Sequence, residues 1–378
     1  MSVAVGHGLI SAYDRVQEHP DVWTSRLSKA RWGDRIPHVE RRPDGSERWV
    51  VDGNPVALQG VAIAGALMLD RSQEPQRWAD VPNLVYDPAA RLKGMDADGV
   101  AASVLYPTVA GASGETFGSI TDAELELACV QAYNDWLIEK WAGASERFIP
   151  LCVVPLYPAE AAAQEIRRAV AMGHRGVIYP PVPMELRDVP HVNEPEYEPL
   201  WSTCEELGVP LCIHAGSSRR GQFAPYSGFS PTLAAALGGL TQPSSTAFVL
   251  VNLVLSRILL RHPGLKVVFA ESGLGWAAYL LEYADHQFEK DRLPREGYDL
   301  TPSQQFRRQC YLTASYECDS LQTRGYIGTE RILWSTSFPQ ANSTWPDTQR
   351  MAERSFREIP EDERRQMASG NAAALFRV

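Results

Sequence analysis

Several side chains that can do chemistry stand at the ends of short apolar runs. Tyr13 and Arg15 close the run LISAYDR, His214 closes PLCIH, and Glu271 closes KVVFAE. A guanidinium binds a carboxylate or enolate oxygen with two parallel hydrogen bonds, and an imidazole beside a carboxylate can move a proton. Arg15, His214 and Glu271 are therefore our candidate catalytic residues.

Hydroxyl and aromatic side chains occupy similar positions and are candidates for substrate binding. They are Tyr13, Tyr106, Tyr179, Ser337 and Trp345. A tyrosine or serine hydroxyl can donate a hydrogen bond to a developing oxyanion, and a tryptophan can form a pocket wall. Packing is the competing interpretation for each of them, because aromatic residues are more often core than chemical groups.

The apolar runs alternate with amphipathic segments along the chain. The runs cover residues 9–13, 102–106, 149–155, 176–179, 210–214, 266–271, 311–315 and 332–335. Helical patterns lie between them at 123–141, 159–172, 195–207, 244–261 and 276–290. Continuous apolar runs of this length are typical of parallel strands covered on both faces. Eight such units predict a (β/α)8 barrel, whose active site lies at the carboxyl ends of the strands.

A doubly wound open sheet is the alternative fold, but the sequence contains neither GxGxxG nor GxxxxGK[ST]. We expect one domain over residues 1–378, with 24–82 as an insertion after the first strand. The stretch RRPDGSERWVVDGNPV within it holds two strand-like pieces with DG turn signals, which predicts a β-hairpin. A lid over the barrel and a dimer contact are its plausible uses.

Composition limits the class of protein. Hydrophobic residues make up 44% of the 378, and 36 basic against 46 acidic residues give a net charge of −10. An acidic chain is a poor general binder of nucleic acid or anionic membranes, so we expect a small-molecule partner. The N-terminus lacks a signal-peptide pattern, and six cysteines without a CxxC pair predict buried thiols in a reducing compartment, so we expect a cytoplasmic protein.

Several blocks in fixed order resemble the amidohydrolase superfamily, in the branch of aminocarboxymuconate-semialdehyde decarboxylase-like "amidohydrolase 2" proteins. The matching stretches include ARLKGMDADGVAASVLYP, PLCIHAG, HPGLKVVFAESGLGW, ILWSTSFPQANSTWP and GNAAALF. This resemblance implies a barrel enzyme that cleaves C–C or C–N bonds, for example by decarboxylation or hydrolysis of a cyclic or aromatic acid. It also implies a homodimer.

Members of this family usually hold one divalent metal in the barrel mouth, and the resemblance places Tyr13 and Arg15 at its first two ligand positions. His214 matches a retained histidine ligand, and Glu271 stands where the sixth strand often carries histidine. The usual aspartate after the eighth strand is replaced within the stretch 336–340, TSFPQ. An arginine cannot donate a lone pair and would repel Zn²⁺, so we predict neither the family metal nor another cofactor.

A shifted metal site is the alternative, built from Asp14, Glu18 or His19 together with His214 and Glu271. Three functional hypotheses remain open. The first is a decarboxylase or hydrolase that uses Arg15 in place of the metal, and the second is a metal-independent lyase, cyclase or dehydratase. The third is an inactive barrel serving as a binding subunit, in which Arg15 and Glu271 form a structural ion pair. Convergent polar groups around Arg15 would favour an enzyme, whereas a mouth filled by side chains would favour the third.

Overall fold

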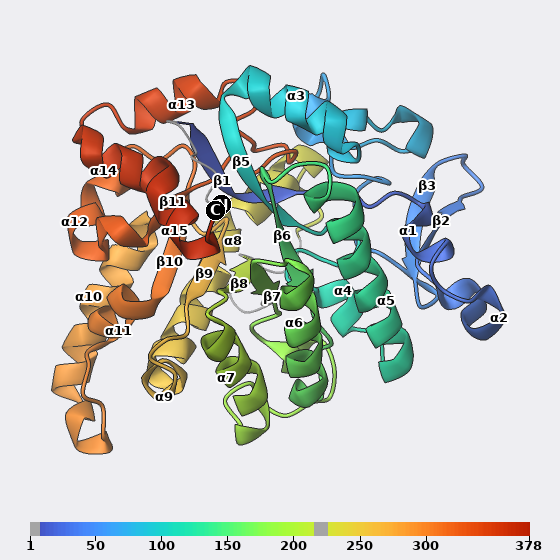
Figure 1. Cartoon of the computed structure of the whole chain (residues 1–378). Helices are drawn as coiled ribbons and strands as arrows, with labels where there is room; N and C mark the ends of the chain where they lie inside the picture. Colours follow the sequence, from blue (N-terminus) through green and yellow to red (C-terminus); the bar gives the residue numbers. More distant parts are fainter. Residues whose placement is uncertain (1–7, 215–225) are drawn as a thin grey trace.

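The computed structural model describes residues 8–214 and 226–378. The eight predicted parallel strands are present and pair in chain order around one sheet. They are β1 (Leu9–Arg15), β5 (Val100–Tyr106), β6 (Phe148–Val153), β7 (Gly176–Ile178), β8 (Leu211–His214), β9 (Val267–Ala270), β10 (Cys310–Ala314) and β11 (Ile332–Trp334). The fold is therefore the expected (β/α)8 barrel, and Figure 1 shows its helices arranged around the strands.

Backbone hydrogen bonds join the first strand to the segment after the last. The amide of Ser337 donates to the carbonyl of Tyr13 at 3.1 Å, and the amide of Arg15 donates to the carbonyl of Phe338 at 2.7 Å. Both ends of the sheet thus meet where β1 ends. Side chains from β1 and from the loop after β11 are brought together there, although they lie more than 300 residues apart in the sequence.

Helices cover the outside of the barrel. The longer ones are α3 (Pro88–Asp98), α5 (Ala123–Trp136), α6 (Ala159–Met172), α7 (Glu198–Leu207), α8 (Pro231–Leu255), α10 (Gly275–Lys290), α11 (Pro302–Gln309) and α13 (Thr348–Ser355). The shorter ones are α1 (Asp21–Thr24), α2 (Lys29–Trp32), α4 (Glu115–Gly118), α9 (Ile258–Arg261), α12 (Arg324–Ile327), α14 (Glu361–Arg365) and α15 (Asn371–Phe376). The helix expected at 244–261 begins earlier and is broken in two, because Arg257 adopts a left-handed conformation with φ 65°.

The barrel interior is a packed apolar core. Ile10, Val104, Leu151 and Val268 belong to it and are at most slightly exposed. Phe376 from α15 belongs to the same core, while Asn371 donates to the carbonyl of Ile332 at 2.7 Å. The closing stretch GNAAALF is helical and covers the end of the barrel at which the strands begin, opposite their carboxyl ends.

The insertion forms a sheet of three strands, one more than the predicted hairpin. β2 (His38–Arg41), β3 (Glu47–Val51) and the two-residue β4 (Asn54–Pro55) are antiparallel. Trp23 packs edge-to-face on Trp49 and on Phe117, which ties this sheet to α4 and α5. In Figure 1 the sheet lies at the side of the barrel beside these helices.

Two further observations concern the cysteines and the helix lengths. All six cysteines are free thiols, and five of them are buried, as predicted. Among the described residues, no helix is long and apolar enough to cross a membrane.

Candidate active site

Three side chains from three strand ends meet at the carboxyl end of the barrel. The Tyr13 hydroxyl lies 2.8 Å from Nε2 of His214, and the same nitrogen lies 2.7 Å from Oε2 of Glu271. Tyr13 is fully buried, and the other two side chains are about one-tenth exposed. The structure thus brings together two of the three candidate catalytic residues and one candidate for substrate binding.

Two amide side chains complete this cluster. Nε2 of Gln340 donates to the Tyr13 hydroxyl at 2.6 Å, and Nδ2 of Asn342 donates to Oε1 of Glu271 at 2.8 Å. Both lie on the loop after β11, in the stretch PQAN. Our sequence analysis marked this stretch only as a lost ligand position and missed Asn342 entirely.

The proton positions follow from the charge of Glu271. Burial of this carboxyl opposes ionisation, but hydrogen bonds and charges from His214, Asn342 and Arg15 outweigh it and lower its pKa. A carboxylate only accepts hydrogen bonds, so Nε2 of His214 must carry a proton toward it. Burial raises the pKa of Tyr13 well above its usual value, so this residue keeps its hydroxyl proton. The cluster therefore holds two transferable protons.

Arg15 is a buried cation without an anionic partner in the described part of the chain. It is 8% exposed, and its Nε donates to the carbonyl of Pro107 at 3.2 Å. No carboxylate of the described residues forms an ion pair with it, Glu271 included, which contradicts the structural ion pair considered above. Its charge nevertheless helps to lower the pKa of Glu271 and opposes the rise at Tyr13. A buried guanidinium normally has a partner, so an anionic ligand is the natural complement of this one.

Backbone geometry around the cluster is unusual at two positions. Glu271 has φ 55° and Ser337 has φ 54°, a left-handed conformation that side-chain-bearing residues seldom adopt. Such conformations cost roughly 1–3 kcal/mol and gather at functional sites. Ser337, a candidate for substrate binding, is buried beside Tyr13 through its backbone. Glu271 combines this backbone conformation with its contact to His214.

The remaining candidates for substrate binding do not hydrogen-bond to His214 or Glu271 in the described structure. Tyr106 packs edge-to-face on Tyr13, with ring centroids 4.8 Å apart, and supports it from within the barrel core. Tyr179 faces the outer layer, where its hydroxyl donates to the carbonyl of Leu156 at 2.7 Å and its ring contacts Trp201. β7 ends at Ile178, so Tyr179 lies outside the cluster, and its role in substrate binding stays a prediction.

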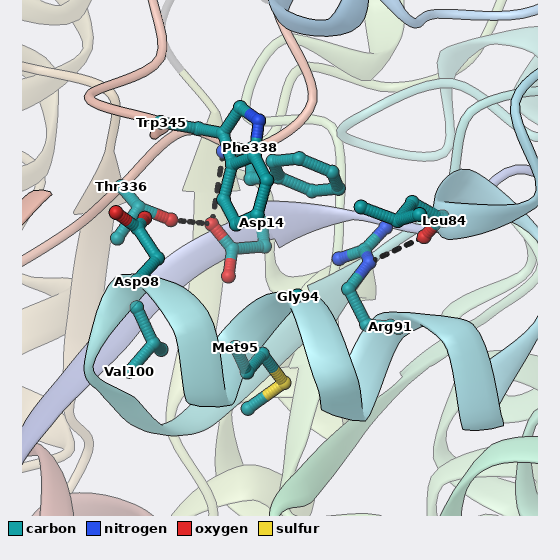
Figure 2. A pocket seen from close by; sticks show the side chains of 10 residues that line it. All are labelled: Asp14, Leu84, Arg91, Gly94, Met95, Asp98, Val100, Thr336, Phe338 and Trp345. Atoms are coloured by element: carbon teal, nitrogen blue, oxygen red, sulfur yellow. Dashed lines mark hydrogen bonds between the residues drawn. The ribbon is translucent and has the colours of Figure 1, made fainter. Parts of the chain in front are cut away.

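Trp345 is also outside the barrel, in a small pocket under α3. It contacts Phe338, and Figure 2 shows both rings on the same side of the pocket as Asp14 and Thr336. The pairing of β1 with β5 shifts between Ser11 and Asp14, which turns Asp14 away from the mouth. Its carboxylate accepts hydrogen bonds from the hydroxyls of Ser11, Ser103 and Thr336. Trp345 is a wall of this outer pocket and lies away from the cluster, and its contact with substrate stays a prediction.

The shifted metal site is not assembled. Asp14 is held in the outer pocket, and Glu18 accepts the backbone amides of Thr108 and Val109. His19 is bound to Asp21 at 2.6 Å. Within residues 8–214 and 226–378, no group of three or more His, Cys, Asp or Glu side chains could hold a metal, and the intervening sequence 215–225 contains none of these residue types.

At the mouth, His214 and Glu271 contact each other at 2.7 Å, and no third His, Cys, Asp or Glu of the described residues joins them in a group that could hold a metal. Catalytic zinc sites supply three protein ligands with free lone pairs. These residues therefore do not fit the metal of the family.

Comparison with known proteins places this barrel in a family. The family model described as Amidohydrolase matches residues 38–378, so the chain belongs to that family. Gamma-resorcylate decarboxylase from Rhizobium radiobacter is 26% identical over 322 residues, covering 80% of this chain and 90% of that protein.

Solved structures share the fold. An amidohydrolase from Mycobacterium avium subsp. paratuberculosis has a TM-score of 0.76 at 20% identity and covers 99% of this chain and 100% of its own. 5-Carboxyvanillate decarboxylase from Novosphingobium aromaticivorans, solved with manganese and 4-hydroxy-3-methoxy-5-nitrobenzoic acid, has a TM-score of 0.68 at 18% identity, with coverages of 99% and 97%. The resemblance to this superfamily seen in the sequence is thus confirmed.

Proposed function

We propose that this protein is a decarboxylase-type lyase that acts on a carboxylated aromatic or enolic compound without the family metal. Buried Arg15, which has no anionic partner among the described residues, is the observation that carries the proposal. It follows Tyr13 by two residues on β1, and the Tyr13 hydroxyl contacts His214, so a carboxylate bound to Arg15 would lie beside the proton-bearing cluster. The similarity to gamma-resorcylate decarboxylases supports this substrate class.

The residues divide the work as follows. Arg15 binds the substrate carboxylate through its terminal nitrogens. The Tyr13 hydroxyl, held by Gln340, donates to the phenol or enol oxygen on which charge develops. His214 gives its Nε2 proton to the carbon that bears the carboxylate, and Glu271 stabilises the histidine during transfer. The C–C bond then breaks, its electron pair returns to the ring, CO₂ leaves, and solvent returns the proton to His214.

A metal-dependent decarboxylase is the competing proposal, because a relative of the same fold was solved with manganese. A dialysed sample assayed with a panel of hydroxybenzoates separates the two. Our proposal predicts CO₂ release that survives chelation and falls in Arg15→Met. The metal-dependent reaction would be supported if chelation abolished CO₂ release, added manganese restored it, and Arg15→Met released CO₂ as fast as the wild type.

The second candidate is a metal-independent cyclase or dehydratase using the same residues. Nε2 of His214 contacts both the Tyr13 hydroxyl and the Glu271 carboxylate, which favours this candidate. A cyclase or dehydratase needs only groups that remove a proton and return one. A substrate panel that includes enolic compounds without a carboxylate distinguishes it, because such compounds do not need Arg15.

A further inference from the structure

The loop of residues 337–345 (the β11 loop) determines the geometry of the cluster. Gln340 and Asn342 on this loop donate to Tyr13 and Glu271. The loop has no regular secondary structure, so its position depends on what holds its backbone. Its first residues, Ser337 and Phe338, are bound to the backbone of β1, and its own turn bonds, from Gln340 to Ser337 and from Ser343 to Gln340, fix its shape. The place of the segment from Pro339 to Trp345 over the barrel depends on further contacts.

A side chain from the insertion binds the outer face of the β11 loop. Nη2 of Arg71 donates to the carbonyl of Trp345 at 2.5 Å, and Nη1 donates to the carbonyls of Ser343 at 3.1 Å and Ala341 at 3.4 Å. Ala341 lies between the two functional amides in the sequence. One guanidinium thus satisfies three carbonyls in the second half of the loop.

The backbone next to Arg71 contacts the same loop. The amide of Ala66 donates to the carbonyl of Pro339 at 3.0 Å. Gly65 comes so close that a Cβ placed on it would lie 3.0 Å from Cβ of Ala341 and 3.0 Å from the carbonyl oxygen of Arg71. Any side chain at position 65 would therefore push the insertion and the β11 loop apart.

We propose that Arg71 is a positioning residue, which clamps the β11 loop so that Gln340 and Asn342 hold Tyr13 and Glu271 in their active arrangement. This inference rests on the proposed function for its effect on turnover, but the clamp itself is a property of the loop. It gives the insertion a role at the barrel mouth, although the insertion's small sheet lies to the side. Turnover then depends on a residue that touches no substrate.

The test compares Arg71→Met with Arg77→Met, a matched control in the same insertion whose arginine pairs with Asp80 on the surface. We expect hydrogen exchange of the 336–346 backbone to accelerate in Arg71→Met only. We also expect kcat to fall roughly tenfold to a hundredfold with KM nearly unchanged, because small displacements of catalytic groups cost about that much. Added guanidinium at millimolar concentration should restore part of kcat, whereas a general loss of stability would not respond.

Gly65→Ala is the second variant, since it keeps Arg71 but disturbs the same contact, and it should accelerate the same exchange. Unchanged exchange at 336–346 in Arg71→Met overturns the proposal, as does faster exchange with an unchanged kcat.

The ¹⁵N signal of His214, assigned with His214→Asn, separates this inference from the proposed function. If the wild-type chain consumes no aromatic carboxylate, the proposed function fails. The clamp is then supported by a shifted His214 signal in Arg71→Met and overturned by an unshifted one.

Discussion

In the described part of the chain, His262 and His214 each contact carboxylates at a largely buried position, and the two clusters differ in the groups that the imidazole nitrogens meet. His262, after α9, has Nδ1 at 3.0 Å from Glu205 and Nε2 at 2.7 Å from Glu198. Both nitrogens must donate, which only the imidazolium form can do. At the mouth, a single nitrogen of His214 serves both a hydroxyl and a carboxylate. The first arrangement holds a proton in place, and the second can pass one on.

The surroundings strengthen the contrast. Arg261 and the amide of Gly264 also bind the two carboxylates at His262, so that cluster joins α7 to the segment before β9. The carboxylate at His214 is bound by an amide of the β11 loop and stands on a strained backbone. A cluster that joins two elements of the fold stabilises it, whereas a cluster on a strained backbone suits chemistry.

The largest expected effect is at the mouth. His214→Asn removes the proton donor, so we expect kcat to fall by about 10²–10⁴ while the free energy of unfolding changes little. Steady-state assays and urea denaturation on the same sample measure both. A large loss of stability with retained turnover would reverse the roles we assign to the two clusters.

The matching substitution at the other cluster should do the opposite. His262→Asn leaves Glu198 and Glu205 facing each other without their cation, so we expect the unfolding free energy to drop by about 1–3 kcal/mol. Turnover at 25 °C should stay within about twofold, as no part of the mouth is touched. Impaired turnover in a fully folded variant would contradict this.

Acid pH should affect the two clusters in the same direction but through different readouts. Burial opposes ionisation of Glu198, yet His262 and Arg261 outweigh it and lower its pKa. A carboxyl with a lowered folded pKa stabilises the protein above its unfolded value of about 4.3. That stability is lost as the pH falls through the folded pKa. The pKa of Glu271 is likewise lowered. The fall of kcat at acid pH should therefore begin below the usual pKa range of a glutamate. An acid limb near pH 6 would contradict our proton assignment.

The smallest effect is expected for Tyr13→Phe. It removes one hydroxyl from the cluster but keeps the ring that packs on Tyr106. Loss of one hydrogen bond to a developing charge should lower kcat roughly tenfold. Tyr106→Phe is the control, and an equal loss there would show that both hydroxyls serve only packing.

The sequence predicted the barrel because eight apolar runs are a strong signal, and parallel strands end at one edge. It therefore also placed Tyr13, His214 and Glu271 correctly at that edge. It could not place Tyr179, because the hydrophobic pattern does not show that β7 ends one residue earlier than predicted. It could not place Trp345, because the direction in which a loop folds leaves no pattern in the sequence. Gln340 and Asn342 were missed because a loop's side-chain directions depend on tertiary contacts such as that of Arg71. A homodimer and a cytoplasmic location stay predictions.

The most direct test of the central claim is calorimetric titration of 2,6-dihydroxybenzoate into wild-type protein and Arg15→Met, each with a chelator and then with added manganese. Our account predicts that the wild type binds equally in both conditions and that Arg15→Met loses binding by roughly a hundredfold, as the removal of one buried charged partner entails. Binding that requires manganese and is unchanged in Arg15→Met would contradict it.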